Sequence, residues 1–372
     1  MTERESRIDW LIFTIVGGVL SLGLILKVGE YKEIYKDYKY ERQKASHVTT
    51  QDGVRYYLYR DENKAVVVPL KRRYDIGSGG IYVTSKFYKG HIAVKDTVTY
   101  LFHKYPVTEV GKEAFEGCEE LESVQLPNTI KKIGEKAFKN CKKLQTINWP
   151  DSLILIKRSA FSHCNSLREV ELYGDCRILE YAFFECDALE RFIYKRERVV
   201  KPNPETDPHV LLHLEKSIAG AAFYGCKNLS YVEIDALNAT FYTFPSDIIG
   251  GGFEPIFGYD KALKEIHISP ECRNIFFHEG SVYDKNTLDL LFCLPTVDSI
   301  YYVPEGANRI LPHAFHGVPL KEIWLPTTIT SICYDAFTDS TIVHLPQYTK
   351  IKIDDEAFNG EQTIEYYIKR PD

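Results

Sequence analysis

Two histidines near the middle of the chain have the spacing of a metal site. His209 and His213 stand four residues apart in His209-Val-Leu-Leu-His213, which would place both imidazoles on one face of a helix. The segment lacks the glutamate that acts as general base in the HExxH motif, and prolines lie nearby. A structural role is therefore favoured, and the sequence predicts no metal site.

Other residues that could support catalysis give weak signals. Gly77-Ser-Gly-Gly80 and Gly250-Gly-Gly252 lack the strand–loop–helix context and the lysine of a phosphate-binding loop, so they favour turns. Cys164 follows His163, but its position recurs along the chain, which disfavours a nucleophile. We expect no catalytic residue and no cofactor. An enzyme with its site in the insertions is the third of three functional hypotheses.

The dipeptide Ala-Phe recurs eight times in the same sequence context. This repeat indicates the architecture that would position any functional residues. A branched aliphatic residue precedes each alanine by four positions. The first three spacings are 23, 23 and 22 residues and the last two are 22 and 21, a period typical of a solenoid. The repeat therefore predicts a scaffold that presents a surface. The alanines are Ala114, Ala137, Ala160, Ala182, Ala222, Ala314, Ala336 and Ala357.

The cysteines follow the same repeat. Five of the nine lie three residues after the repeat phenylalanine, and no CxxC motif occurs. This regularity indicates a column of small buried side chains rather than disulfides or a thiolate zinc site. The five are Cys118, Cys141, Cys164, Cys186 and Cys226.

Each turn is followed by a predicted strand whose side chains alternate inward and outward, and the charges support stacking of successive coils. Glutamates of one coil fall opposite lysines of the next, which predicts ion pairs across coils. The net charge of −6 is mild and argues against a nucleic-acid partner. The expected pairs are Glu109–Lys132, Glu113–Lys136, Glu116–Lys139, Glu119–Lys142 and Glu120–Lys143.

The outward strand positions form the best candidate surface for a partner. Two columns are expected, one from Ser123 and Thr146 through Glu169 to Glu322, the other from Gln125 and Asn148 through Glu171 to Trp324. An exposed tryptophan is a typical interface anchor. Two alternatives stay open, ordinary solvated sheet residues or a Trp324 packed under a loop. The candidates are Glu169, Glu171, Tyr231, Glu233, Glu265, His267, Glu322 and Trp324.

The N-terminal region has the features of a membrane anchor. Residues 10–26 carry no charge over 17 positions, and a transmembrane helix is expected over residues 10–29. The mixed charges of the tail, residues 1–9, and the absence of a cleavage site disfavour a signal peptide. A juxtamembrane stalk helix is expected over residues 30–46. The lysines after the anchor favour a cytoplasmic body, but acidic residues interleave with them.

The rest of the chain divides at a change in periodicity. Period-two segments within residues 47–108 predict an N-terminal β-rich cap over the first coil. The solenoid is expected over residues 109–372. It is interrupted by insertions at 195–217, 235–256 and 273–303, the last of which contains a predicted strand pair. Insertions in repeat arrays map to loops and often carry function.

These repeats resemble the BspA-type leucine-rich repeats. Val110-Gly111 through Pro127 and Ile133-Gly134 through Pro150 fit the pattern Ile-Gly-x-x-Ala-Phe-x-x-Cys-x-x-Leu-x-x-Val-x-Leu-Pro. The resemblance implies a leucine-rich repeat solenoid, a right-handed α/β-type superhelix with mostly parallel β structure and short helical turns. It also implies a surface or secreted protein, bacterial or from some protists, that acts in adhesion and protein binding.

The preferred hypothesis is a single-pass membrane-anchored, non-catalytic leucine-rich-repeat module that binds a protein or a glycan at the cell surface. The alternative is a structural subunit of a membrane complex, held through the anchor helix and the repeat edge. The resemblance favours repeats outside the cytoplasm, whereas the lysines after the anchor leave a cytoplasmic body open. The partner and the oligomeric state are not defined by the sequence.

Overall fold

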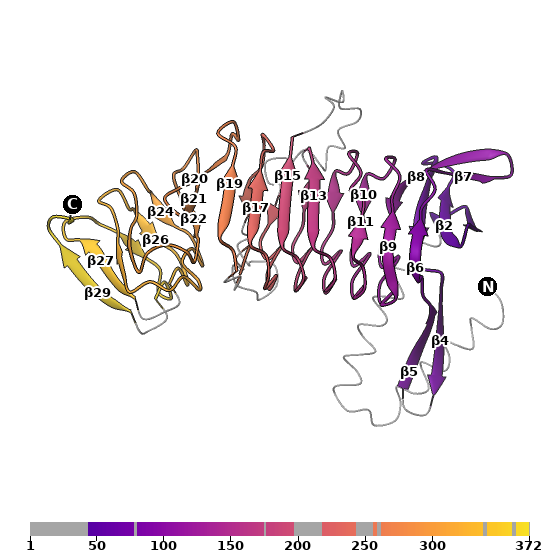
Figure 1. Ribbon diagram of the computed structural model, residues 1–372, viewed down its shortest axis with the longest axis horizontal. Helices are drawn as coiled ribbons and strands as arrows, with labels where there is room; N and C mark the ends of the chain where they lie inside the picture. Colours follow the sequence, from indigo (N-terminus) through magenta and orange to yellow (C-terminus); the bar gives the residue numbers. More distant parts are fainter. Residues whose placement is uncertain are drawn as a thin grey trace.

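The computed structural model describes residues 44–77, 80–174, 176–196, 218–242, 256–258, 262–337, 341–358 and 362–371. These residues form a long array of short strands that runs from β1–β8 to β29 (Figure 1). The expected transmembrane helix and all but the last three residues of the expected stalk lie outside this part of the chain. Within it, no helix is long and apolar enough to cross a membrane.

Antiparallel strands precede the first coil. β2 pairs with β1 and with β3, and β8 then joins β3 in parallel and forms a hairpin with β7. β4 and β5 form a separate hairpin that projects from the array (Figure 1). The strands are β1 (His47–Gln51), β2 (Val54–Tyr59), β3 (Lys64–Val68), β4 (Lys71–Gly77), β5 (Gly80–Lys86), β7 (Thr97–Tyr100) and β8 (His103–Val110).

The first block of coils, here the N-terminal repeat block (residues 109–268), contributes two strands per coil. One set continues in parallel from β8, and the other lies on the opposite side of the coils as two separate sheets. The first set is β10 (Lys132–Ile133), β12 (Leu155–Ile156), β14 (Arg177–Ile178), β16 (Ile218–Ala219) and β18 (Phe241–Tyr242). The second begins with β6 (Gly90–Ala93), which precedes the block, and continues with β9 (Leu121–Gln125) and β11 (Thr146–Ile147), then β13 (Glu169–Tyr173), β15 (Arg191–Lys195), β17 (Tyr231–Ile234) and β19 (Glu265–Ile268).

The strand pair expected within residues 273–303 is confirmed, and it leads into a second block. β21 pairs antiparallel with β20 and β22, and β22 then starts a parallel sheet. The C-terminal repeat block (residues 290–367) has its own hydrophobic core. β20 (Ile275–His278) and β21 (Ser281–Asp284) precede this block. Its strands are β22 (Leu290–Cys293), β24 (Arg309–Ile310), β26 (Ser331–Ile332) and β28 (Lys352–Ile353), and opposite them β23 (Ile300–Tyr302), β25 (Glu322–Trp324), β27 (Ile342–Pro346) and β29 (Thr363–Tyr367).

The expectation of short helical turns is wrong for the described coils, which contain no helix. In six of the described turns, those at Ala114, Ala137, Ala160, Ala182, Ala222 and Ala314, two residues have positive φ, one before the alanine and one two positions after the phenylalanine. In the second coil these are Lys136 and Asn140, with φ of 55° and 62°. Left-handed residues cannot continue a right-handed helix. They direct N–H groups to the next coil instead, so Phe138 N donates to Ala160 O at 2.7 Å.

The repeat phenylalanines stack in two interior columns, one from Phe115 to Phe223 and the other from Phe315 to Phe358. Neighbouring rings stack nearly in parallel, with centroids 4.9 Å apart between Phe138 and Phe161. The cysteine column is confirmed, because all five repeat cysteines are buried and free. Each thiol from the second coil on lies against a phenylalanine carbonyl of the coil before it, as Cys164 Sγ does with Phe138 O at 3.2 Å.

The ion pairs predicted between the glutamates of one coil and the lysines of the next are confirmed in part. Lys132 pairs in register with Glu109 on adjacent strands. Two of the five expected pairs are ion pairs, Glu119–Lys142 at 2.7 Å and Glu120–Lys143 at 2.8 Å. Glu109 approaches Lys64 of the preceding strand rather than Lys132.

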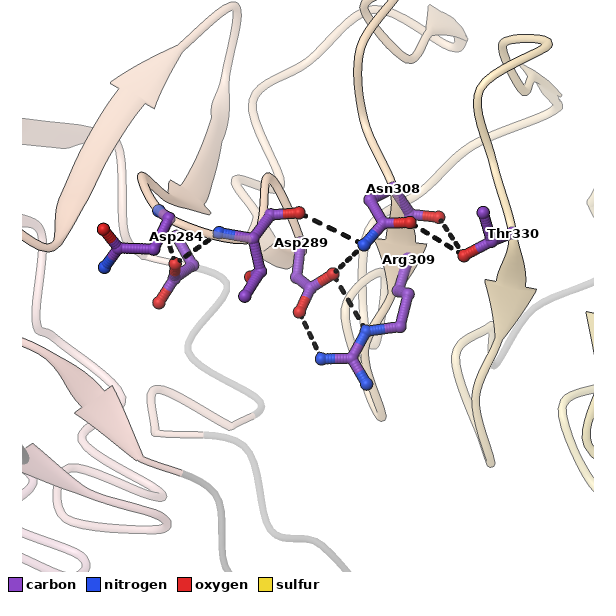
Figure 2. A network of polar contacts seen from close by, with 7 residues as sticks. Asp284, Asp289, Asn308, Arg309 and Thr330 are labelled. Carbon is purple, nitrogen blue, oxygen red and sulfur yellow. Dashed lines mark hydrogen bonds and ion pairs between the residues drawn. The ribbon is translucent and has the colours of Figure 1, made fainter.

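A buried carboxylate joins the β20–β22 hairpins to the coils that follow (Figure 2). Asp289 is 2% exposed and accepts hydrogen bonds from Arg309, with Nε at 2.9 Å, and from Asn308 Nδ2 at 3.2 Å. Thr330 of the next coil donates to the Asn308 side chain at 2.8 Å. One network therefore spans three successive segments of the C-terminal repeat block.

Candidate binding surface

The expected outward columns form in register on four strands of the N-terminal repeat block. We call the outward side chains of β13, β15, β17 and β19 the N-terminal strand face. Residue pairing places Glu169, Arg191, Tyr231 and Glu265 side by side in one row. The second row is Glu171, Ile193, Glu233 and His267.

The first row of this face is occupied by internal contacts. Arg191 lies 3.3 Å from Glu169, and its guanidinium stands over the Tyr231 ring at 4.5 Å. The Tyr231 hydroxyl donates to Glu233 at 2.9 Å. That hydrogen bond raises the pKa of Tyr231 above its usual value, because it favours the protonated phenol.

The charges of the second row are also paired within the face. Lys195 lies 2.9 Å from Glu171, which also accepts a hydrogen bond from Tyr173. His267 lies 3.5 Å from Glu265 and packs its ring against Tyr231. The charged side chains of the N-terminal strand face thus alternate in sign and pair with one another.

The columns do not run unbroken along the whole chain, contrary to expectation. β11 and β13 are not paired, and a groove of about 870 Å³ lies between them, lined mainly by polar side chains such as Asn148, Arg168 and Glu169. Trp149 takes the position of Leu126 one coil on, and its larger indole packs edge-on against Phe161 and Phe183. We attribute the break to this wider residue.

Glu322 and Trp324 lie on a different sheet. We call the outward side chains of β23, β25, β27 and β29 the C-terminal strand face. The Trp324 indole stacks on His344 at 3.7 Å and on Tyr302 at 6.1 Å, and it meets Tyr367 at 5.4 Å. It is half-buried and contacts strand residues, so it does not stand fully exposed.

Apolar and aromatic atoms are exposed on this face. Ile300 is 42% exposed and Tyr302 is 38% exposed. His344 is buried, with its ring nitrogens 3.1 Å from Glu322 and 3.4 Å from Glu365. The two carboxylates hold the imidazole flat against Trp324, which fixes the orientation of the indole.

The structure thus separates the eight predicted residues into a set of six and a set of two. Sequence reasoning missed Ile300, Tyr302 and His344, which lie on strands paired with β25. The signal was present, because Tyr302 and His344 stand 22 residues before and 20 residues after Trp324.

Reactive groups are sparse in the described coils. Burial raises the pKa of the Cys164 thiol well above its usual value, which disfavours a thiolate nucleophile. His209 and His213 lie outside the described residues. Among the residues that the structure places, His313, His316 and Asp335 form a group whose ligand atoms could hold a metal ion. Burial lowers the pKa of His313 below its usual value.

The comparisons with known proteins agree with this architecture. The sequence matches the family described as BspA type leucine rich repeat region, in six copies, over residues 95–200 and 293–370. No curated protein matches the sequence.

Solved structures with a similar fold include PcpA, a pneumococcal vaccine antigen. It has 17% identity and a TM-score of 0.57, over 83% of this chain and 78% of its own. A leucine rich cell surface protein from Faecalibacterium prausnitzii has 18% identity and a TM-score of 0.48, over 88% of this chain and 97% of its own. At such identities the likeness to PcpA supports the fold alone.

Proposed function

Since the chain belongs to the BspA-type leucine-rich repeat proteins, we propose that it is a membrane-anchored, non-catalytic module that binds a protein partner. Repeats of this family are interaction modules. The uncharged segment of residues 10–26 supports a single membrane anchor. The description of PcpA as a vaccine antigen supports placing the repeats outside the cytoplasm.

The C-terminal strand face is the proposed binding surface, and its aromatic row carries the proposal. Tyr302, Trp324 and His344 form a rigid stack with exposed apolar edges beside Ile300. Aromatic side chains held in place supply contact area at little entropic cost, and tryptophan and tyrosine are the commonest interface hot spots. Glu322 and Glu365 provide a polar rim.

The six predicted residues on the N-terminal strand face have a lesser role in this proposal. Their charges already have partners on the same face, as in Glu169–Arg191 and Glu171–Lys195. A protein that docked there would have to desolvate satisfied ion pairs, and exposed pairs repay little. That face supports solubility and coil register.

Site-specific photo-crosslinking in cells tests the proposal. We expect a photoreactive residue at Ile300 to give a discrete adduct, and the same residue at Glu265 on the N-terminal strand face to give none. Trp324→Ala should abolish the adduct, because loss of a hot spot costs about 2 kcal/mol or more, roughly 30-fold in affinity. Circular dichroism of each variant reports whether it folds.

Two outcomes would contradict the proposed surface. One is an adduct from position 300 that survives Trp324→Ala in a folded protein. The other is an equal yield of the same adduct from position 265. Adducts only from the anchor segment would instead support the structural-subunit alternative. A C-terminal alkaline phosphatase fusion, compared with a fluorescent protein fusion, tests which side of the membrane the repeats occupy.

A further inference from the structure

A group of metal-ligating side chains lies on the turns of the C-terminal repeat block, apart from both strand faces. His313 and His316 flank the Ala-Phe of one turn, and Asp335 takes the position of His313 one coil later. One ligand atom from each of the three lies within 4.8 Å of the others. We propose that His313, His316 and Asp335 form a Zn²⁺ site that joins two consecutive coils.

The backbone of the repeat brings two of the ligands together. His313 and Asp335 both have left-handed φ, 58° and 48°, and His313 N donates to Asp335 O at 3.1 Å. Equivalent residues with the same backbone conformation on adjacent coils project their side chains in the same direction. His316 follows three residues later in the same turn, and its ring lies 5.6 Å from that of His313.

The His313 imidazole is buried with one nitrogen that lacks a partner. Its side chain is 11% exposed, and Nδ1 lies 2.8 Å from a carboxylate oxygen of Asp335, itself 13% exposed. Nε2 has no hydrogen-bond partner among the residues that the structure describes. Buried polar atoms are nearly always satisfied, so an imidazole in this state indicates an absent ligand.

The donor set suits zinc. Two imidazole nitrogens and one carboxylate oxygen are ligands that Zn²⁺ commonly takes, with bonds of about 2.0–2.2 Å in a tetrahedron. Such bonds place ligand atoms about 3.4 Å apart, a separation between the 2.8 Å from His313 Nδ1 to Asp335 and the 4.8 Å that bounds the group. The fourth position would hold water or a group from a partner.

A metal at this site would link two adjacent coils, as buried thiols do in the N-terminal repeat block. In the N-terminal repeat block, thiols such as Cys141 and Cys164 contact carbonyls of the preceding coil. At the corresponding position after His313, the C-terminal repeat block has Val318, which has no polar atom in its side chain.

Calorimetry and thermal melting of the untagged full-length chain with zinc chloride test the site. We expect one equivalent of Zn²⁺ to bind, and saturation to raise the melting temperature by about 5 °C. His316→Gln and Asp335→Asn should each weaken binding by about 100-fold or more, because loss of a ligand should cost at least as much as loss of an outer-shell partner. His278→Gln, which changes an exposed histidine on β20, is the matched control.

The absorption spectrum of bound Co²⁺ distinguishes this site from a site formed by the cysteines. Co²⁺ bound to nitrogen and oxygen gives visible d–d bands without the charge-transfer band of a thiolate. Asparagine tolerates left-handed φ, so Asp335→Asn keeps the turn while it removes the charge. A wild-type chain that binds no Zn²⁺ would overturn the proposal. So would wild-type affinity in both His316→Gln and Asp335→Asn, or a thiolate spectrum that these variants leave unchanged.

Discussion

The two strand faces are built on the same repeat, yet their outward side chains differ in what they leave available. On the N-terminal strand face, charges of opposite sign alternate between neighbouring strands, as in Glu169 and Arg191, and satisfy one another. On the C-terminal strand face, Tyr302, Trp324 and His344 stack, and Ile300 and Tyr302 stay partly exposed to solvent. The repeat therefore determines only spacing, and the outward residues decide whether a face is closed or able to bind.

Substitutions of the interior phenylalanines should change the free energy of unfolding most, and they compare the two blocks directly. Phe161→Ala should lower the free energy of unfolding by about 4 kcal/mol, because its ring is buried and contacts Phe138, Phe183 and Trp149. Phe358→Ala should cost about half as much, since Phe358 is half-buried and stacks only on Phe337 among the described rings. Urea denaturation measures both.

Phe102→Ala is the control for these variants, because Phe102 is fully exposed and should leave the unfolding midpoint unchanged. Equal losses in the free energy of unfolding for Phe161→Ala and Phe358→Ala would contradict the expectation that the rings pack more closely in the N-terminal repeat block.

The joint before the C-terminal repeat block should give the next largest effect. Asp289→Ala removes a buried acceptor from Arg309 and Asn308, and we expect a loss of roughly 3 kcal/mol in the free energy of unfolding. Limited proteolysis should then cut first near β22. Asp298→Ala, at an exposed position nearby, is the control. A midpoint equal to the control would mean that the network does not hold the joint.

The thiols make stability depend on alkaline pH. Burial raises the pKa of Cys141 well above its usual value and that of Cys293 to about 12. A thiol whose pKa is raised by folding stabilises the fold below its unfolded pKa of about 8.5, and this stability is lost as pH rises towards the folded value. Each such thiol should add about 1.4 kcal/mol per pH unit to the loss above pH 9.

Urea midpoints between pH 8 and pH 10.5 measure that loss, and Cys141→Ala should reduce its slope. Most buried thiols lie in the N-terminal repeat block, so that block should be the more sensitive. At pH 8 a thiol reagent should react with Cys333, which is only partly buried, before any cysteine of the column. A slope unchanged in Cys141→Ala would contradict the assignment.

The exposed ion pairs between coils should have the smallest effect. Lys143, through a hydrogen bond and its charge, lowers the pKa of Glu120. The resulting stability is present above the unfolded pKa and is lost as pH falls through the folded value. Because both groups are exposed, Glu120→Gln should leave the melting temperature unchanged at physiological salt. A clear decrease would give these pairs a structural role.

Much of the fold could be predicted from the chain because a repeat averages out local ambiguity. The Ala-Phe period located the phenylalanine column, the cysteine column and the register of β13 to β19. The strand pair in residues 273–303 was also predicted from the sequence, and it forms. These features depend on spacing, which one sequence displays directly.

The remaining features depend on conformation and volume, which spacing does not report. The turns were expected to be helical from the resemblance to leucine-rich repeats, but left-handed residues such as Lys136 and Asn140 redirect the backbone. Trp149 fits the inward pattern, yet only its packing shows that it separates β11 from β13. His344 and Tyr302 became relevant only once pairing placed them beside Trp324.

The hydrogen bonds that join turn to turn, such as Phe161 N to Ala182 O, also govern how the protein responds to force. They lie along the stacking direction, so tension between the two ends loads them in series. Coils should then detach one at a time from an end. Each detached coil of 22 residues releases about 75 Å of chain. A chain held at a membrane by one end and at a partner by the other would thus lengthen in steps, while the remaining coils kept their shape.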